Sequence, residues 1–198
     1  MQERQVTIGK ETYPLPNPFM VIATQNPLES LGVYTLPEAQ VDRFLFKLKV
    51  TYPTVAEEEF VLQQNMTLRD FKSFEVQPIF NEEKIKRLQQ ATMNIYTNEH
   101  IRKYIIAIID ATRNPTKYNI SAAKYLEFGA SPRASIGIFI SAKAHALISG
   151  RKYVTPQDVK EVTKDVLRHR IFLNYEAQVD NIDSDKIISE VLRKVPVP

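Results

Sequence analysis

FMVIATQNP (19–27) is an apolar run that stops at an Asn-Pro turn, and LPEAQVDRF (36–44) follows it closely. An apolar run of this length, bounded by a turn signal, predicts a fully buried strand of a parallel sheet. Pro37 is expected to begin a short helix that leads into a second strand, FLFKLKV (44–50). Since ligands of open α/β sheets lie beyond the carboxyl ends of the strands, Asn26 is placed where chemistry takes place.

The composition is that of an ordinary globular protein and excludes several kinds of site. The 198 residues are 43% hydrophobic and 25% charged. The absence of cysteine excludes disulfides and cysteine-ligated zinc and fits a reducing cytoplasm, which is the expected location. The three histidines are far apart in the sequence, so we predict no metal-ligating residues in this chain.

Charge and hydropathy argue against two further classes of partner. No apolar stretch reaches the roughly 18–20 residues of a membrane span, so we expect none. The net charge is +3, but lysine and arginine form no block, so nucleic acid is not predicted as a partner.

The chain is expected to have two parts. Residues 4–15 are typical of a β-hairpin that turns at Gly9-Lys10. After Tyr52-Pro53 the pattern becomes helical, which predicts a boundary between an α/β part (1–52) and an α-helical part (53–198). One helix of the second part contains IIAIIDA (105–111), which imitates a magnesium-binding strand but continues a helical pattern.

Capping signals predict where the helices of the second part begin. A side-chain oxygen directly before a helical pattern accepts a hydrogen bond from a free N–H of the first turn. The expected caps are Thr54, Asn81, Thr97 or Asn98, Ser131, Thr155, and Asp183 or Ser184. Gly150 is expected to end the helix that Ser131-Pro132 begins.

Asn26 and Arg43 are candidate catalytic residues. An asparagine amide at a strand tip can hold a water in line for attack on a phosphoryl group. An arginine keeps its charge and offers five donors, which suits the negative charge of phosphate oxygens in a transition state. The alternatives are an Asn-Pro turn that only ends a strand, and an Arg43 that is solvated or paired with Asp42 or Glu38.

Arg133 is a candidate for binding a nucleotide. It lies in the first turn of the helix that begins after Ser131, where the helix dipole disfavours a cation. A phosphate bound by the free N–H groups of that turn would remove the conflict. The alternative is a solvated arginine, or one paired with Glu127.

Several segments taken together resemble the MoxR family of AAA+ ATPases, in the family's order and through nearly the whole chain. They are ATQNP (23–27), YTLPEAQVDRF (34–44), GASPRA (129–134), GRKYVTPQDV (150–159) and DVLRHRIFLNYEA (165–177). The resemblance implies a remnant of the AAA+ α/β core, with buried parallel strands and a hairpin, followed by an all-α helical lid.

By this resemblance each candidate has a role. Asn26 corresponds to sensor 1, which positions water, and Arg43 to the arginine finger, which reaches the nucleotide of a neighbouring subunit. Arg133 corresponds to the sensor 2 arginine. The family implies binding and hydrolysis of ATP with Mg²⁺, ring hexamers, a chaperone-like role in assembling protein complexes, and partners with von Willebrand factor A domains.

The sequence also departs from the family pattern. The phosphate loop G-x-x-x-x-G-K-[ST] and the Mg²⁺-binding strand are absent from the 198 residues. We therefore expect a fragment that is inactive alone, with an exposed apolar face in residues 19–50 that is disordered or self-associates. The alternatives are a non-enzymatic adaptor with a AAA+ lid fold, and a DNA-associated AAA+ relative.

Overall fold

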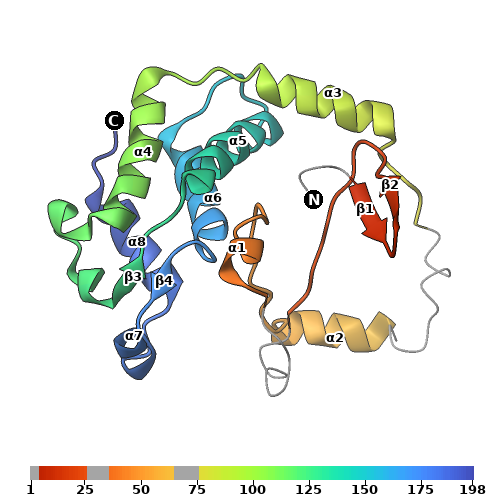
Figure 1. Cartoon of the computed structure of the whole chain (residues 1–198). Helices are drawn as coiled ribbons and strands as arrows, with labels where there is room; N and C mark the ends of the chain where they lie inside the picture. Colours follow the sequence, from red (N-terminus) through yellow and green to blue (C-terminus); the bar gives the residue numbers. More distant parts are fainter. Residues whose placement is uncertain (1–4, 26–35, 65–75) are drawn as a thin grey trace.

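The computed structural model describes residues 5–25, 36–64 and 76–198 (Figure 1). Asn26 lies outside these ranges. Helices and short connections dominate, and most of the buried side chains belong to residues 95–195. No helix within the three ranges is long and apolar enough to cross a membrane.

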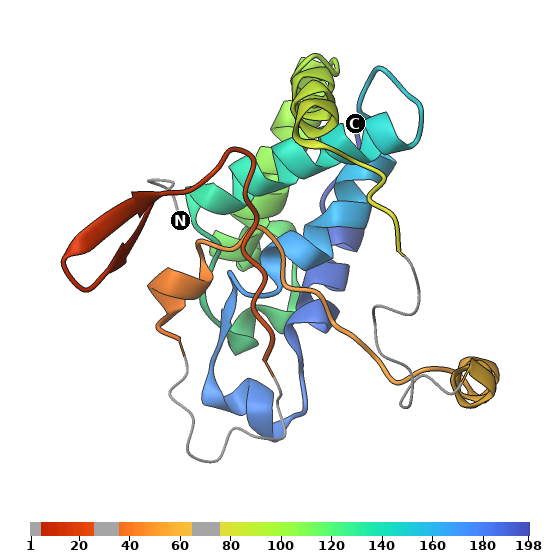
Figure 2. The same ribbon diagram turned by 90° about the vertical axis from the view of Figure 1, so that its right-hand side faces the viewer.

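The predicted hairpin is confirmed. Strands β1 (Gln5–Ile8) and β2 (Glu11–Pro14) pair antiparallel, with Val6 opposite Tyr13. Gly9 turns the chain at φ +64°, in the left-handed region that glycine enters without steric cost. All eight strand residues are exposed, and the hairpin lies apart from the helical body (Figures 1 and 2).

The two buried parallel strands are not found, although the organisation of a AAA+ remnant followed by a helical lid is confirmed. The described residues form two small antiparallel sheets, and neither contains residues 19–24 or 44–50. Ile22 is 75% exposed and Val50 is 96% exposed. A strand needs a neighbour that pairs its backbone N–H and C=O groups, and these ranges supply none. Apolar side chains of the described residues of this face, among them Met20, Leu48 and Val50, are therefore open to solvent.

The helical body contains four main helices that pack around one core (Figures 1 and 2). They are α4 (Glu99–Arg113), α5 (Pro132–Ile148), α6 (Pro156–Leu167) and α8 (Ser184–Lys194). The smaller elements are η3 (Pro115–Tyr118), η4 (Ser121–Tyr125), β3 (Leu126–Phe128), β4 (Phe172–Leu173) and α7 (Tyr175–Val179). Strands β3 and β4 pair antiparallel, with Leu126 opposite Leu173.

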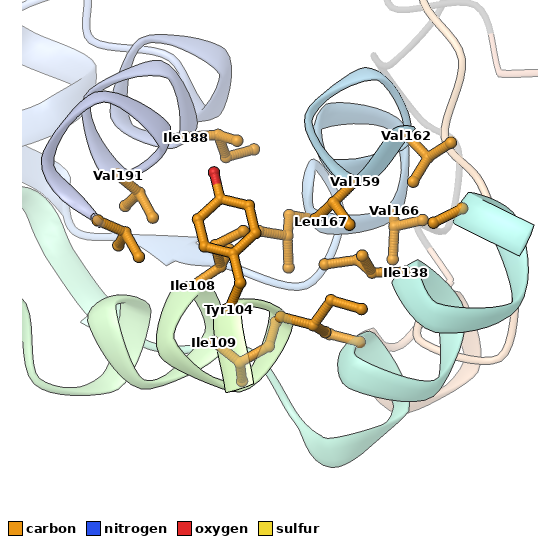
Figure 3. Packing of buried hydrophobic residues seen from close by; sticks show 14 of the residues in the cluster. Tyr104, Ile108, Ile109, Ile138, Val159, Val162, Val166, Leu167, Ile188 and Val191 are labelled. Atoms are coloured by element: carbon orange, nitrogen blue, oxygen red, sulfur yellow. The ribbon is translucent and has the colours of Figure 1, made fainter. Parts of the chain in front are cut away.

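Branched aliphatic side chains fill the space between these helices. In α4, Tyr104 and Ile108 are four residues apart and therefore point from one face into the core (Figure 3). They meet residues of α6 and α8, among them Leu167 and Ile188, which are fully buried. Each such side chain contributes about 2 kcal/mol by leaving water. The segment IIAIIDA is thus a core helix, as predicted.

The predicted helix starts are confirmed. Asn98 accepts a hydrogen bond from the Ile101 N–H at 2.8 Å, and Asn81 accepts one from the Lys84 N–H at 2.9 Å. The other caps are Thr54, Ser131, Thr155 and Asp183. Gly150 follows α5 with φ +72°, as expected for a residue after the helix end.

Three helices lie outside the main bundle. They are α1 (Glu38–Val41), α2 (Val55–Gln64) and α3 (Glu82–Met93). The residues of α2 whose surroundings are described are all exposed, and α3 buries none of its own. The boundary at residues 52 and 53 stays a prediction.

A buried carboxylate joins the end of α5 to the start of α6. Asp158, which is 0% exposed, accepts hydrogen bonds from His145 Nδ1 at 2.7 Å and Arg151 Nη1 at 2.6 Å. It also accepts from the N–H and hydroxyl of Thr155, which completes a capping box. Burial opposes the charge of Asp158, but the bonds from Arg151 and Thr155 outweigh it and hold its pKa well below the usual range.

Asp158→Ala is expected to destabilise the fold by about 3 kcal/mol, because it leaves the half-buried Arg151 guanidinium and the N-terminus of α6 without their acceptor. Glu161→Ala, at an exposed position of the same helix, should change stability by less than about 0.5 kcal/mol. Urea unfolding followed by circular dichroism measures both. Equal stabilities of the two variants would contradict this role of Asp158.

Candidate functional site

Asp42 is the residue at which the two most distinctive sequence motifs meet. It follows α1, in LPEAQVDRF, and its carboxylate contacts Ser131 and Arg133 at the start of α5, in GASPRA. It accepts hydrogen bonds from the Ser131 hydroxyl at 3.1 Å and from Arg133 Nη1 at 3.3 Å. A third bond, at 2.9 Å, comes from Arg170 Nε, beyond the end of α6.

The carboxylate of Asp42 removes the conflict that the sequence indicates at Arg133. An anion was expected beside the positive end of α5, and the structure places the Asp42 carboxylate there, next to Ser131 and Arg133. The alternative pairing with Glu127 is not made. The Arg133 side chain remains 45% exposed, and Nη1 is its one side-chain nitrogen with a partner in the described ranges.

Arg43, the next residue after Asp42, is exposed. Its guanidinium makes no hydrogen bond or ion pair with any residue in the described parts of the chain, so neither expected pairing, with Asp42 or with Glu38, is formed. Its backbone N–H donates to Gln40 O at 3.2 Å. Arg43 is thus adjacent in sequence to the carboxylate that binds Arg133, and most of the guanidinium donors of the two arginines remain free among the described residues.

Arg170 was not singled out by the sequence, although it lies in a segment that carries the resemblance. Its side chain is 3% exposed. Besides Asp42 Oδ1, its guanidinium donates to the backbone carbonyls of Asp42, Phe44, Leu45 and Val166. These bonds use all five N–H donors of an arginine. Burial lowers the pKa of Arg170, and its bond to Asp42 opposes that effect.

His169, the residue before Arg170, binds the same segment at Phe44. Its Nε2 lies 2.9 Å from Phe44 O, and because a carbonyl can only accept, Nε2 carries the proton. Nδ1 is buried without a partner. Burial lowers the pKa of His169 to about 4, so the ring is neutral at pH 7.

The chain after Phe44 continues along the end of α6 and the start of α8. The Lys47 N–H donates to Asp165 O at 2.8 Å, and Arg168 donates to Lys47 O. Lys49 Nζ forms ion pairs with Asp183 at 2.9 Å and Asp185 at 2.8 Å. Residues 42–49 are thus held by the helical body instead of by neighbouring strands.

The first residue of GASPRA must be glycine for steric reasons. A Cβ at Gly129 would lie 2.6 Å from Thr112 O, a backbone atom of α4. The close approach allows the Thr112 hydroxyl to accept from the Ala130 N–H at 3.0 Å, and Arg113 Nε to donate to Ala130 O at 2.8 Å. These contacts fix the loop that leads into Ser131.

Comparison with known proteins identifies the family. A family model described as "AAA lid domain" matches residues 120–191, and one described as "ATPase family associated with various cellular activities (AAA)" matches residues 1–46. Chaperone MoxR1 of Mycobacterium tuberculosis is 46% identical over the whole chain, and Protein MoxR of Paracoccus denitrificans is 28% identical. The chain belongs to the MoxR family of AAA+ ATPases.

The fold of this MoxR-family chain also matches a solved structure. A crystal structure of a candidate ATPase from Cytophaga hutchinsonii is 44% identical and aligns over the whole chain with a TM-score of 0.90. The chain covers 59% of that structure, 52% of MoxR1 and 61% of the Paracoccus protein. It therefore spans between half and two thirds of these relatives.

Gly129→Ala is expected to cost about 2 kcal/mol, because the added methyl group collides with the backbone of α4. Glu127→Ala, at an exposed position two residues earlier, should change stability by less than about 0.5 kcal/mol. Thermal unfolding of both variants tests this, and an unchanged midpoint for Gly129→Ala would contradict the close packing.

His169 should make stability depend on pH. Its pKa is lowered in the folded chain, so the unfolded state binds the proton more tightly and stability falls as the pH drops from about 6.5 to about 4. Between about pH 7 and about pH 5 the expected loss is about 2 kcal/mol.

His169→Gln keeps a donor for Phe44 O but does not titrate, so it should remove this part of the pH dependence. His100→Gln, at an exposed position, should retain it. Urea unfolding at the two pH values measures the difference, and an identical pH dependence in the parent and in His169→Gln would show that His169 is not its source.

Proposed function

We propose that this chain supplies the sensor and arginine-finger groups of a MoxR-type ATPase that hydrolyses ATP in a ring-shaped assembly. One observation carries the proposal: Arg43 is exposed and unpaired among the described residues, while Asp42 beside it is bound by Arg133 and Arg170. A structural arginine would be expected to use its donors within the fold. Arg43 instead keeps them available to a ligand outside the chain.

The chemistry of Arg43 suits a phosphoryl-transfer site. Its guanidinium would stabilise negative charge on the oxygens of the transferred group without losing its own charge. Its backbone is fixed by the preceding turn of α1, which limits the entropy lost when it contacts a ligand. Since no phosphate loop lies within the chain, we propose that Arg43 acts on a nucleotide held by a neighbouring subunit.

Arg133 would bind the same nucleotide. One of its nitrogens contacts Asp42 at 3.3 Å, and its remaining donors have no partner in the described ranges. Because Arg43 directly follows Asp42, to which Arg133 is bound, both arginines would contact the phosphates of one nucleotide. This arrangement supports a sensor 2 role for Arg133, linking the nucleotide to α5 and hence to the helical lid.

Asn26 and the cofactors complete the proposal. Asn26 would hold the attacking water through its side-chain amide. ATP supplies the phosphoryl group that is transferred, and the free guanidinium donors of Arg43 and Arg133 fit its phosphate oxygens. The described residues contain no group of three acidic or histidine side chains arranged to hold a metal ion, so the ligands of Mg²⁺ would come from outside them.

The wider role follows from the family. We propose a cytoplasmic protein that forms homo-oligomeric rings, with hexamers as the expected size. Its chaperone-like activity would act on other protein complexes, with von Willebrand factor A domain proteins as partners. The name of Chaperone MoxR1 supports the chaperone-like part of this proposal.

The test uses a fusion in which a phosphate-loop segment from a MoxR-family relative precedes residues 1–198. We expect the fusion to hydrolyse ATP and the 198 residues alone not to. Arg43→Ala in the fusion should lower kcat by about 1000-fold and leave ATP affinity nearly unchanged, because the arginine contacts the transition state. Coupled phosphate release and fluorescent nucleotide titration measure the two quantities.

Arg87→Ala is the matched control, since Arg87 is exposed on α3 and, among the described residues, forms its ion pair with Glu83 one turn away. It should leave turnover unchanged. An active fusion whose turnover is unaffected by Arg43→Ala would refute the arginine-finger role. Turnover by the 198 residues alone would refute the expected dependence on a separate phosphate loop.

A further inference from the structure

We propose that Arg170 is a positioning residue that fixes the backbone on both sides of Arg43 and couples it to the helical lid. This inference rests on the proposed function, because it assigns Arg170 a task in presenting Arg43. It goes beyond that function by naming a residue that would touch neither nucleotide nor water.

The first argument is the direction of its hydrogen bonds. Of the five donors of Arg170, one bonds Val166 O in the last turn of α6. The other four bond the carboxylate and carbonyl of Asp42 and the carbonyls of Phe44 and Leu45. The residues held are thus those directly before and directly after Arg43.

The second argument is the energetic cost of this arrangement. Taking a guanidinium out of water is unfavourable unless every donor is paired, and an apolar side chain could fill the same space at lower cost. The arginine is explained if a precise backbone position is needed. Residues 44–50 have no strand neighbour in the described ranges, so bonds from Arg170 replace those of a sheet.

The third argument is that α5 lies close to Arg170 and to the segment that Arg170 binds, residues 42–45. A Cβ at Gly137 would lie 3.0 Å from Val166 Cγ1 and 3.4 Å from Leu45 Cδ1. Glycine therefore lets α5 pack directly against α6 and the held segment. Since Arg133 lies on α5 and shares Asp42 with Arg170, a movement of α5 and α6 would carry Arg43 with it.

The decisive variant is Arg170→Lys, which keeps the charge but loses the planar fork that reaches several carbonyls. In the 198-residue chain, hydrogen exchange of residues 42–48 should become about tenfold faster, because the Lys47 N–H bond to Asp165 O opens more often. Exchange in α4 and α8 should stay unchanged. Arg87→Lys, on exposed α3, should alter neither.

In the active fusion, Arg170→Lys should lower kcat by about 100-fold with an unchanged KM for ATP, as expected when a reacting group is displaced. If Arg170→Lys only reduced the amount of folded protein, the remaining folded molecules would have the kcat of the parent. Hydrogen exchange of residues 42–48 in those molecules would also equal that of the parent. Asp42→Asn, which keeps the shape but removes the charge shared by Arg133 and Arg170, should also lower kcat, by about tenfold.

The outcomes separate the two proposals. Loss of turnover in Arg43→Ala with parent turnover in both Arg170→Lys and Asp42→Asn would overturn the positioning role alone. Unchanged exchange of residues 42–48 in Arg170→Lys would overturn it as well. Unchanged turnover in Arg43→Ala would overturn the proposed function, and the positioning role with it. If hydrogen exchange shows that Arg170→Lys is unfolded, the turnover of Asp42→Asn is compared with that of Arg43→Ala instead. Parent turnover in Asp42→Asn would then overturn the positioning role.

Discussion

A buried guanidinium with all five donors satisfied is the interaction on which the arrangement of this chain depends. Arg170 joins residues that are more than a hundred positions apart, and it does so mainly through backbone carbonyls. Such an ion is tolerated inside a protein only when its hydrogen bonds are complete. The bonds therefore specify one position of the segment after α1 relative to α6. The ion pair between Arg170 and Asp42 fixes the start of this segment. Bonds from His169 and Arg168 to its backbone carbonyls add to the same effect.

The contrast between residues 42–49 and residues 19–24 shows the effect of the hydrogen bonds from Arg170. Both were expected to be strands, and both lack strand partners in the described ranges. Residues 42–49 are nevertheless fixed by the helical body, whereas Met20 and Ile22 are exposed and make no comparable contacts. Polar side chains that follow α6 thus determine that residues 42–49 have a fixed position, whereas residues 19–24 have no such contacts in the described parts of the chain. In a MoxR-type assembly this would couple Arg43 to the lid more firmly than to the rest of the core.

The exposed apolar surface has the same origin. Strands of a parallel sheet are apolar because both of their faces are normally covered, so these side chains remain in water when no neighbouring layer is present. Val50, beyond the last contact of Lys49, is among the most exposed aliphatic residues of the described chain. Surfaces of this kind are typical of protein–protein contacts. The relatives matched by this chain extend well beyond the length it spans.

The sequence by itself determined the helices, because caps and apolar periodicity act through neighbours within one turn. Asn98 and Thr155 accept the N–H bonds that their positions predict. It also placed Arg43 and Arg133 among the candidates, since their residue types and motifs are visible locally. The tertiary structure alone decided that Asp42 binds Arg133 and Arg170 and that residues 44–49 contact helices instead of strands. Arg170 and His169 were missed for the same physical reason: their hydrogen bonds join residues about 125 positions apart, and no local pattern encodes such a contact.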